Sequence, residues 1–207
     1  ISLNPFENHV TITSEEIHTL PYGAFEGKIS VISRPEEIEK AVQAISKEKI
    51  LGFDTETRPT FKKGQYHKVA LLQISSEDHA WLFRLHHCGI SDELKEILED
   101  ESILKCGVAI RDDLKALQKI KPFEPGGFIE LAALAKQKGL QVEGLRKLAA
   151  ILLGIRISKS AQTSNWESRI LTDKQLQYAS TDAWVCLGIY RRLLRKKDYH
   201  HSVDQTS

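Results

Sequence analysis

The sequence predicts one mixed α/β domain, in which helices cover a sheet of parallel and antiparallel strands. Strand-like runs fill the first half of the 207-residue chain, and helical periodicity fills the second half. Residues 24–197 contain no internal repeat, no low-complexity linker and no break in composition. These observations predict a single domain over 24–197, with an N-terminal arm at 1–23 and a flexible tail at 198–207.

The expected elements follow one another in a simple order. Residues 1–22 are mixed and polar, which predicts an irregular arm. A helix start is expected at 33–37, because proline and glutamate suit a first helical turn, and apolar residues then recur at i, i+3, i+4 and i+7. The predicted strands are 28–32, 50–53, 69–74, 80–85 and 103–110. The predicted helices are 38–45, 94–98, 112–120, 131–138, 142–153 and 173–196, and the whole stretch from 128 onward has a helical pattern.

Composition narrows the class of protein. Apolar residues make up 41% of the chain and charged residues 28%, which is ordinary for a globular domain, and the net charge is +1. Any anionic partner must therefore meet a local patch or bound metal ions. The three cysteines lack CxxC spacing, which predicts reduced thiols and a cytoplasmic location.

The sequence predicts neither membrane insertion nor export. No apolar run approaches the length of a bilayer span, and the first ten residues lack the features of a secretory signal. Because the chain has no methionine, we expect the native protein to begin upstream of Ile1.

Two carboxylates stand at the end of a predicted strand. Asp54 and Glu56 are two residues apart, so their side chains point to the same face. Carboxylates held this close repel each other unless a cation lies between them. A metal site is one interpretation, and two solvated acids at a strand end are the more common one for such a pair alone.

Further acids lie on or near predicted helices. Tyr178 and Asp182 are four residues apart and share a helix face, in an apolar context where an unpaired charge is costly. An ion pair with a cation such as Arg169 is the alternative. Asp112 and Asp113 lie at a strand-to-helix junction, where aspartate often serves as a cap. Asp113, one residue further into the helix, is the better candidate for a site.

Taken together, these acids favour a pair of hard divalent cations. Mg²⁺ and Mn²⁺ prefer oxygen ligands and leave positions open for water and substrate phosphate. Two such ions about 3.5–4 Å apart can promote an in-line displacement at phosphorus. A tyrosine hydroxyl beside them can orient the attacking water.

Five segments carry a family resemblance. They are 52–56 (GFDTE), 105–113 (KCGVAIRDD), 177–183 (QYASTDA), 68–74 (KVALLQI) and, around the loop before the last helix, 153–154 with 159–166. In order and spacing, over roughly residues 48–194, the chain resembles the 3′–5′ exonucleases of the DEDD superfamily. Within it the chain is most similar to the tyrosine branch, which includes ribonuclease D and the Werner-type exonuclease domains.

The resemblance implies an RNase H-like fold and assigns roles to five residues. Asp54, Glu56, Asp113 and Asp182 would bind two Mg²⁺ or Mn²⁺ ions, and Tyr178 would position the water. Asp54 would bridge both ions, Glu56 and Asp182 would hold the water-activating ion, and Asp113 would support the second.

The resemblance also implies the reaction and the partner. The partner would be a nucleic acid, single-stranded or at the 3′ end of a duplex, and the products nucleoside monophosphates, with DNA favoured. A ribonuclease D-like exoribonuclease is the alternative. A catalytically dead nucleic-acid-binding domain is a third hypothesis, which the complete residue set disfavours.

Substrate contacts are less well defined by the sequence. Lys115 replaces an aromatic residue of the Werner-type pattern, and Thr57 with Arg58 replaces an aromatic residue and a proline, so substrate preference does not transfer. The basic and aromatic loop 58–68 predicts phosphate and base contacts through Arg58 and Phe61, or else a solvated surface loop. In the loop 159–166, we expect Lys159 and Asn165 to bind substrate or brace the site. The cationic cluster at 191–197 is more simply a complement to the dipole of the last helix.

Overall fold

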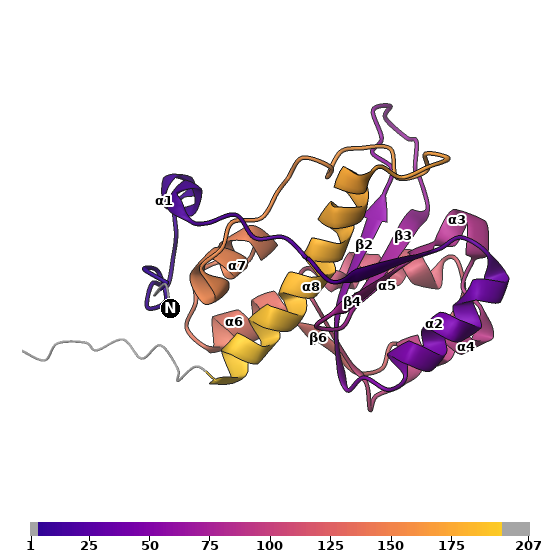
Figure 1. Ribbon diagram of the computed structural model, residues 1–207, viewed down its shortest axis with the longest axis horizontal. Coiled ribbons are helices and arrows are strands. Elements are labelled where there is room, and N and C mark those ends of the chain that lie inside the picture. Colours follow the sequence, from indigo (N-terminus) through magenta and orange to yellow (C-terminus); the bar gives the residue numbers. More distant parts are fainter. Residues whose placement is uncertain (1–3, 196–207) are drawn as a thin grey trace, which may run out of the picture.

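The computed structural model describes residues 4–195 (Figure 1). The strands are β1 (Lys28–Ile32), β2 (Ile50–Thr57), β3 (Val69–Ser75), β4 (His79–Arg84), β5 (Leu104–Gly107) and β6 (Phe128–Glu130). The helices are α1 (Ser14–Thr19), α2 (Ile38–Ile45), α3 (Leu85–Cys88), α4 (Asp92–Glu99), α5 (Ile110–Gln118), α6 (Leu131–Gln137), α7 (Leu145–Leu153) and α8 (Asp173–Arg195), and a short 3-10 helix η1 (Pro35–Glu37) leads into α2.

The strands form one mixed sheet in the order β1-β4-β3-β2-β5-β6. β3 runs antiparallel to both of its neighbours, β2 and β4, whereas β1 pairs with β4, β2 with β5 and β5 with β6 in parallel. The α/β class that the sequence predicted is confirmed.

Helices cover both faces of the sheet. One face packs against α2, α4 and α5, in a core built around Leu51, Phe53 and Leu72. The other face packs against α6, α7 and α8, with Cys106 and Cys186 among the buried residues. Helix α8 crosses the middle of the sheet, as the long yellow helix in Figure 1 shows, and it contacts β2, β3, β4 and β5.

A glycine lets α8 lie directly on β2. A Cβ atom at Gly52 would come within 1.7 Å of the Ala183 carbonyl oxygen, far closer than two atoms can approach. Any side chain at this position would push the helix away from the strand. Asp182 directly precedes Ala183 in α8, so this close contact also holds Asp182 beside β2.

Three predicted elements differ from the structure. The segment 128–130 is a strand, β6, not the start of a helical stretch. The strand predicted at 103–110 ends at Gly107, because Ala109 takes a left-handed conformation (φ 57°, ψ 37°) and α5 begins at Ile110. The strand predicted at 50–53 continues to Thr57, so it carries the two acids within it.

The segment expected to be irregular contains helix α1. Thr13 and Glu16 form a capping box at its start. Ile12, Ile17 and Leu20 are buried in the same core as α6 and α7, so this part of the arm packs against the domain. The predicted tail at 198–207 and the cations at 196–197 lie outside the described residues, and the domain boundaries stay a prediction.

Across residues 4–195, no helix combines the length and the apolar character needed to cross a membrane.

Candidate metal centre and its cleft

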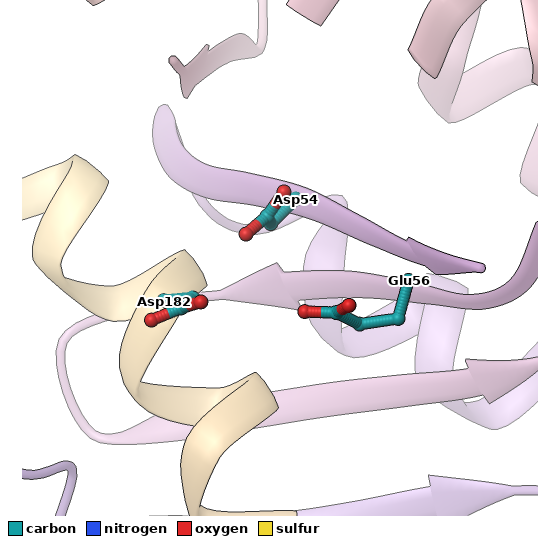
Figure 2. Close-up of side chains that lie close together, drawn as sticks. All are labelled: Asp54, Glu56 and Asp182. Atoms are coloured by element: carbon teal, nitrogen blue, oxygen red, sulfur yellow. The ribbon is translucent and has the colours of Figure 1, made fainter. Parts of the chain in front are cut away.

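Strand β2 and helix α8 bring three carboxylates together. One oxygen each from Asp54, Glu56 and Asp182 lies within 4.8 Å of the other two. Figure 2 shows Asp54 and Glu56 reaching from the strand toward Asp182 on the helix. Two of the side chains are almost fully buried, Glu56 at 9% exposure and Asp182 at 6%. Acids more than a hundred residues apart in the sequence thus meet in one acidic centre.

The local sequence explains why these side chains converge. Along β2, Leu51 and Phe53 point into the core beneath α2 and α4, so the alternate positions Gly52, Asp54 and Glu56 face α8. The parallel partner β5 pairs with β2 at 50–52, and its chain then turns away into α5. The acid-bearing half of β2 is therefore open on that side and has β3 as its paired neighbour.

Burial disfavours ionisation of all three acids, and repulsion from neighbouring acids adds to this effect for Asp54 and Glu56. Burial, followed by repulsion from Asp54, Asp182 and Asp113, raises the pKa of Glu56 to about 10. The pKa of Asp54 lies well above its ordinary value for the same two reasons. Burial raises the pKa of Asp182 to about 7, although the Tyr178 hydroxyl and the nearby Arg146 oppose this shift.

This donor set fits a hard divalent cation. The three side chains offer closely spaced carboxylate oxygens and no nitrogen or sulfur, which suits Mg²⁺ or Mn²⁺. A cation between them would replace the lost hydration and cancel the repulsion that raises their pKa values. Arg146, and not the alternative partner Arg169, is the cation whose charge lowers the pKa of Asp182.

Asp113 lies beside this cluster and not inside it. It sits in the first turn of α5 and accepts a hydrogen bond from the Thr55 hydroxyl. Its charge contributes to the raised pKa values of Asp54 and Glu56, and burial raises its own pKa. Asp112, one residue earlier, is exposed to solvent.

The start of α5 is held by a residue that the sequence did not indicate. The Glu130 carboxylate accepts hydrogen bonds from the backbone N–H groups of Ala109 and Ile110, each at 2.9 Å, and from Ala132 at 3.1 Å. It thereby caps both α5 and α6. No local signal could reveal this contact, because it joins residues about twenty positions apart through the unpredicted strand β6.

Tyr178 faces the acids from the preceding turn of α8. Its hydroxyl lowers the pKa of Asp182, and the residue lines the same cleft. Burial, followed by the charge of Asp182, raises the pKa of the Tyr178 hydroxyl. The side chain therefore remains a neutral hydroxyl, able both to donate and to accept a hydrogen bond.

Gln73 is a second residue that the sequence reasoning did not select. It is fully buried on β3, opposite Asp54 in the ladder, and it lowers the pKa of Glu56. Both polar atoms of its side chain lack a partner with good hydrogen-bonding geometry in the described part of the chain. A polar residue inside the apolar run 69–74 was the signal that could have revealed it.

The acids form one wall of a cleft of about 1080 Å³. Cationic side chains line the cleft as well, namely Lys136, Arg146, Lys147 and Lys159. Ser14 and Ile17 of α1 contribute from the N-terminal arm. The cleft thus combines an acidic centre with cations suited to a polyanion.

The predicted substrate-binding residues divide between two places. Lys159 lines the cleft of the acids, whereas Arg58, Phe61 and Asn165 line a separate hollow of about 470 Å³ under the loop 58–68. Arg58 forms an ion pair with Glu167 at 3.2 Å. Lys115 is exposed on α5.

Comparison with known proteins identifies the family. Residues 29–198 match the family model described as "3'-5' exonuclease". The chain is 38% identical over 157 residues to exonuclease 3'-5' domain-containing protein 2 of Drosophila melanogaster, an alignment that covers 74% of this chain and 27% of that protein. It is 35% identical over 150 residues to the mouse bifunctional 3'-5' exonuclease/ATP-dependent helicase WRN, covering 70% of this chain and 11% of the relative. The chain therefore spans only a small part of these two relatives.

Solved structures share the fold. Escherichia coli RNase D superposes with a TM-score of 0.72 at 27% identity, over 81% of this chain and 44% of that one. The Nibbler EXO domain of Aedes aegypti superposes with a TM-score of 0.75, over 83% and 90% of the two chains, and at 21% identity it supports the fold alone. On the family match and these likenesses, the chain belongs to the 3′–5′ exonuclease family.

Proposed function

We propose that this chain is a metal-dependent 3′–5′ exonuclease that hydrolyses nucleic acid to nucleoside monophosphates. The observation that carries the proposal is the convergence of Asp54, Glu56 and Asp182 within 4.8 Å, at the wall of a cleft that also holds cationic side chains. Family membership supplies the direction of the reaction.

Two Mg²⁺ or Mn²⁺ ions are the cofactors that we propose. Asp54, Glu56 and Asp182 would hold them directly, and Asp113 would support one of them from α5. When bound, such ions supply an activated water and stabilise the leaving oxygen of a phosphodiester.

The protein's own side chains would orient the reactants. In this proposal Tyr178 places the chain in the tyrosine branch of the DEDD superfamily. Its hydroxyl would hold the attacking water beside Asp182. Lys159 and Arg146 line the same cleft and would bind the substrate's phosphates. Phe61 and Asn165, further along, would contact the strand beyond its terminal nucleotide.

DNA is the substrate that we favour, and the 26% identity to the DNA polymerase I of Aquifex aeolicus supports this choice. A ribonuclease D-like activity on RNA is the second candidate. It is supported by the 27% identity to Escherichia coli RNase D and by a related Trypanosoma brucei RNase D whose structure was solved in complex with RNA. Matched DNA and RNA strands of one sequence, digested in parallel, separate the two.

The test of the activity is the digestion of a 5′-labelled strand. With Mg²⁺ or Mn²⁺ the label should move down a ladder in single-nucleotide steps, and EDTA should stop the reaction. Asp54→Ala should reduce the rate by several orders of magnitude, whereas the exposed neighbour Asp112→Ala should retain it. Full activity in Asp54→Ala would refute the assignment.

We further propose a reducing, cytoplasmic location. All three cysteines are buried free thiols, and burial raises the pKa of Cys88 to about 11 and that of Cys106 to about 12. Such thiols are poor nucleophiles and need no oxidising compartment.

A further inference from the structure

The loop between β2 and β3 exposes two aromatic side chains. Phe61 is 87% exposed and Tyr66 is 90% exposed, the highest values among the large hydrophobic side chains of the described residues. The loop also carries Lys62, Lys63 and Lys68, and no acidic residue lies within 58–68. Aromatic faces interleaved with cations are typical of surfaces that bind single-stranded nucleic acid.

Both ends of this loop lie beside the same residue, Glu167. Arg58 Nη1 lies 3.2 Å from Glu167 Oε2, and His67 Nδ1 lies 3.8 Å from Glu167 Oε1. Between these anchors the tip turns at Gly64 (φ 82°), which has open space around it. The loop therefore projects at the end of β2, beside the segment that precedes α8 (Figure 1), with its base held and its aromatic tip free.

The loop directly follows the part of β2 that carries the acids. It begins directly after Thr57, the neighbour of Glu56. The segment that borders the cleft with Lys159 and Gln162 continues into the hollow under the loop with Thr163 and Asn165. The cleft and the hollow are thus bordered by consecutive residues of one segment.

We propose that Phe61 and Tyr66 form a stacking platform for the bases of a single strand whose 3′ end lies at the acids. Lys62 and Lys63 would contact the phosphates of the same stretch, and Arg58 would anchor the loop through Glu167. The inference rests on the proposed function and adds to it how the strand is held upstream of the terminal nucleotide. Because every base has a π-face, the platform would accept any sequence, in DNA or RNA.

The test compares substrate lengths in the double variant Phe61→Ala/Tyr66→Ala. The substrates are a dinucleotide and a 5′-labelled single strand of about twelve nucleotides, within the usual site sizes for such proteins. The ratio of kcat/KM for the long over the short substrate should fall on the order of tenfold per aromatic residue removed. Leu194→Ala, which also removes an exposed apolar side chain (58% exposed), should leave this ratio unchanged.

A second measurement separates stacking from phosphate contacts. Replacing the upstream bases of the long strand with abasic sites should lower kcat/KM for the wild-type protein and leave that of the double variant nearly unaffected. Phe61→Trp/Tyr66→Trp should keep the wild-type length ratio.

The outcomes distinguish the two proposals. A wild-type protein inactive on both lengths would overturn the proposed function itself. An active wild-type protein together with a double variant of unchanged length ratio would overturn the platform alone. Equal losses on the dinucleotide and the long strand would also overturn it, since a platform acts on upstream nucleotides.

Discussion

At the scale of single residues, the acidic centre lowers the stability of the metal-free protein. Asp54 is buried and close to two other carboxylates, and its pKa is raised by burial and by their charges. Its carboxylate accepts one hydrogen bond, from the Thr55 N–H at 2.8 Å. Function and stability therefore oppose each other here, as they often do at active sites.

Asp54→Asn should stabilise the metal-free protein by about 1 kcal/mol. The amide oxygen can keep the bond to the Thr55 N–H. Asparagine is neutral in both states, whereas the Asp54 carboxyl, whose pKa is raised on folding, must take up a proton to become neutral, and this uptake costs stability. Urea unfolding in EDTA measures the effect, with Asp112→Asn as the control at an exposed acid. A variant less stable than wild type in EDTA would show that the buried Asp54 carboxyl does not destabilise the metal-free protein.

At the scale of elements, the site depends on how closely α8 approaches β2. Gly52→Ala should destabilise the protein by about 1–3 kcal/mol and weaken Mn²⁺ binding, because a Cβ would meet the Ala183 carbonyl oxygen and displace the helix that carries Asp182. Gly144→Ala is the matched control, since that glycine has open space and a negative φ. Urea unfolding and calorimetric titration with Mn²⁺ measure the two effects, and normal Mn²⁺ binding in Gly52→Ala would contradict this account.

The start of α5 offers a second element-scale prediction. In Glu130→Gln, an amide NH₂ replaces one of the oxygens that accept from Ala109 and Ile110, at a cost of about 1–2 kcal/mol in stability. Asp113 lies on the same first turn, so we also expect weaker Mn²⁺ binding. Adding Ala109→Gly relieves the left-handed backbone and should recover part of both losses. Mn²⁺ affinity that stays at the wild-type value would show that Glu130 does not position Asp113.

These two elements also mark what the sequence could predict. Helix α8 has long, clear periodicity, and a predicted strand leads into Asp54 and Glu56, so spacing placed Asp54 with Glu56 on one face and Tyr178 with Asp182 on another. The resemblance to the exonucleases, not the spacing alone, joined the two pairs into one site. The end of β5 could not be placed, because the apolar run continues into α5 and the left-handed residue that breaks it is an alanine, which does not signal that conformation. Strand β6 is three residues long and leads directly into α6, so its helical neighbours dominate the pattern.

At the scale of the whole molecule, a net charge of +1 conceals a strong separation of charge. Four acids, Asp54, Glu56, Asp113 and Asp182, gather at the end of β2, while Lys136, Arg146, Lys147 and Lys159 line the same cleft. Composition could not show this arrangement, since it arises when residues from β2, α5, α7 and α8 meet. The acidic centre couples folding to the binding of metal ions. The buried acids are costly to ionise without a metal ion, and they bind one well once they are ionised.

This coupling gives the metal-free protein an unusual pH dependence. Acids with a folded pKa above the unfolded value keep their protons in the folded state while the unfolded state has lost them. The unfolded chain then binds fewer protons, so stability falls as the pH rises. The fall should start near the ordinary carboxyl values of 3.8 and 4.5, and continue through about 7 for Asp182 toward about 10 for Glu56.

Divalent cations should reverse this trend. Metal binding requires ionised carboxylates, so the rise in Tm on adding Mn²⁺ should be larger near about pH 8 than near about pH 5. Thermal unfolding with EDTA or with Mn²⁺ across this range measures both slopes. Asp54→Asn should flatten the metal-free slope and remove most of the Mn²⁺ effect, whereas Asp112→Asn should change neither. If the metal-free protein instead gained stability between these two pH values, the three acids would already be ionised in the folded state. Their pKa values would then not be raised by folding.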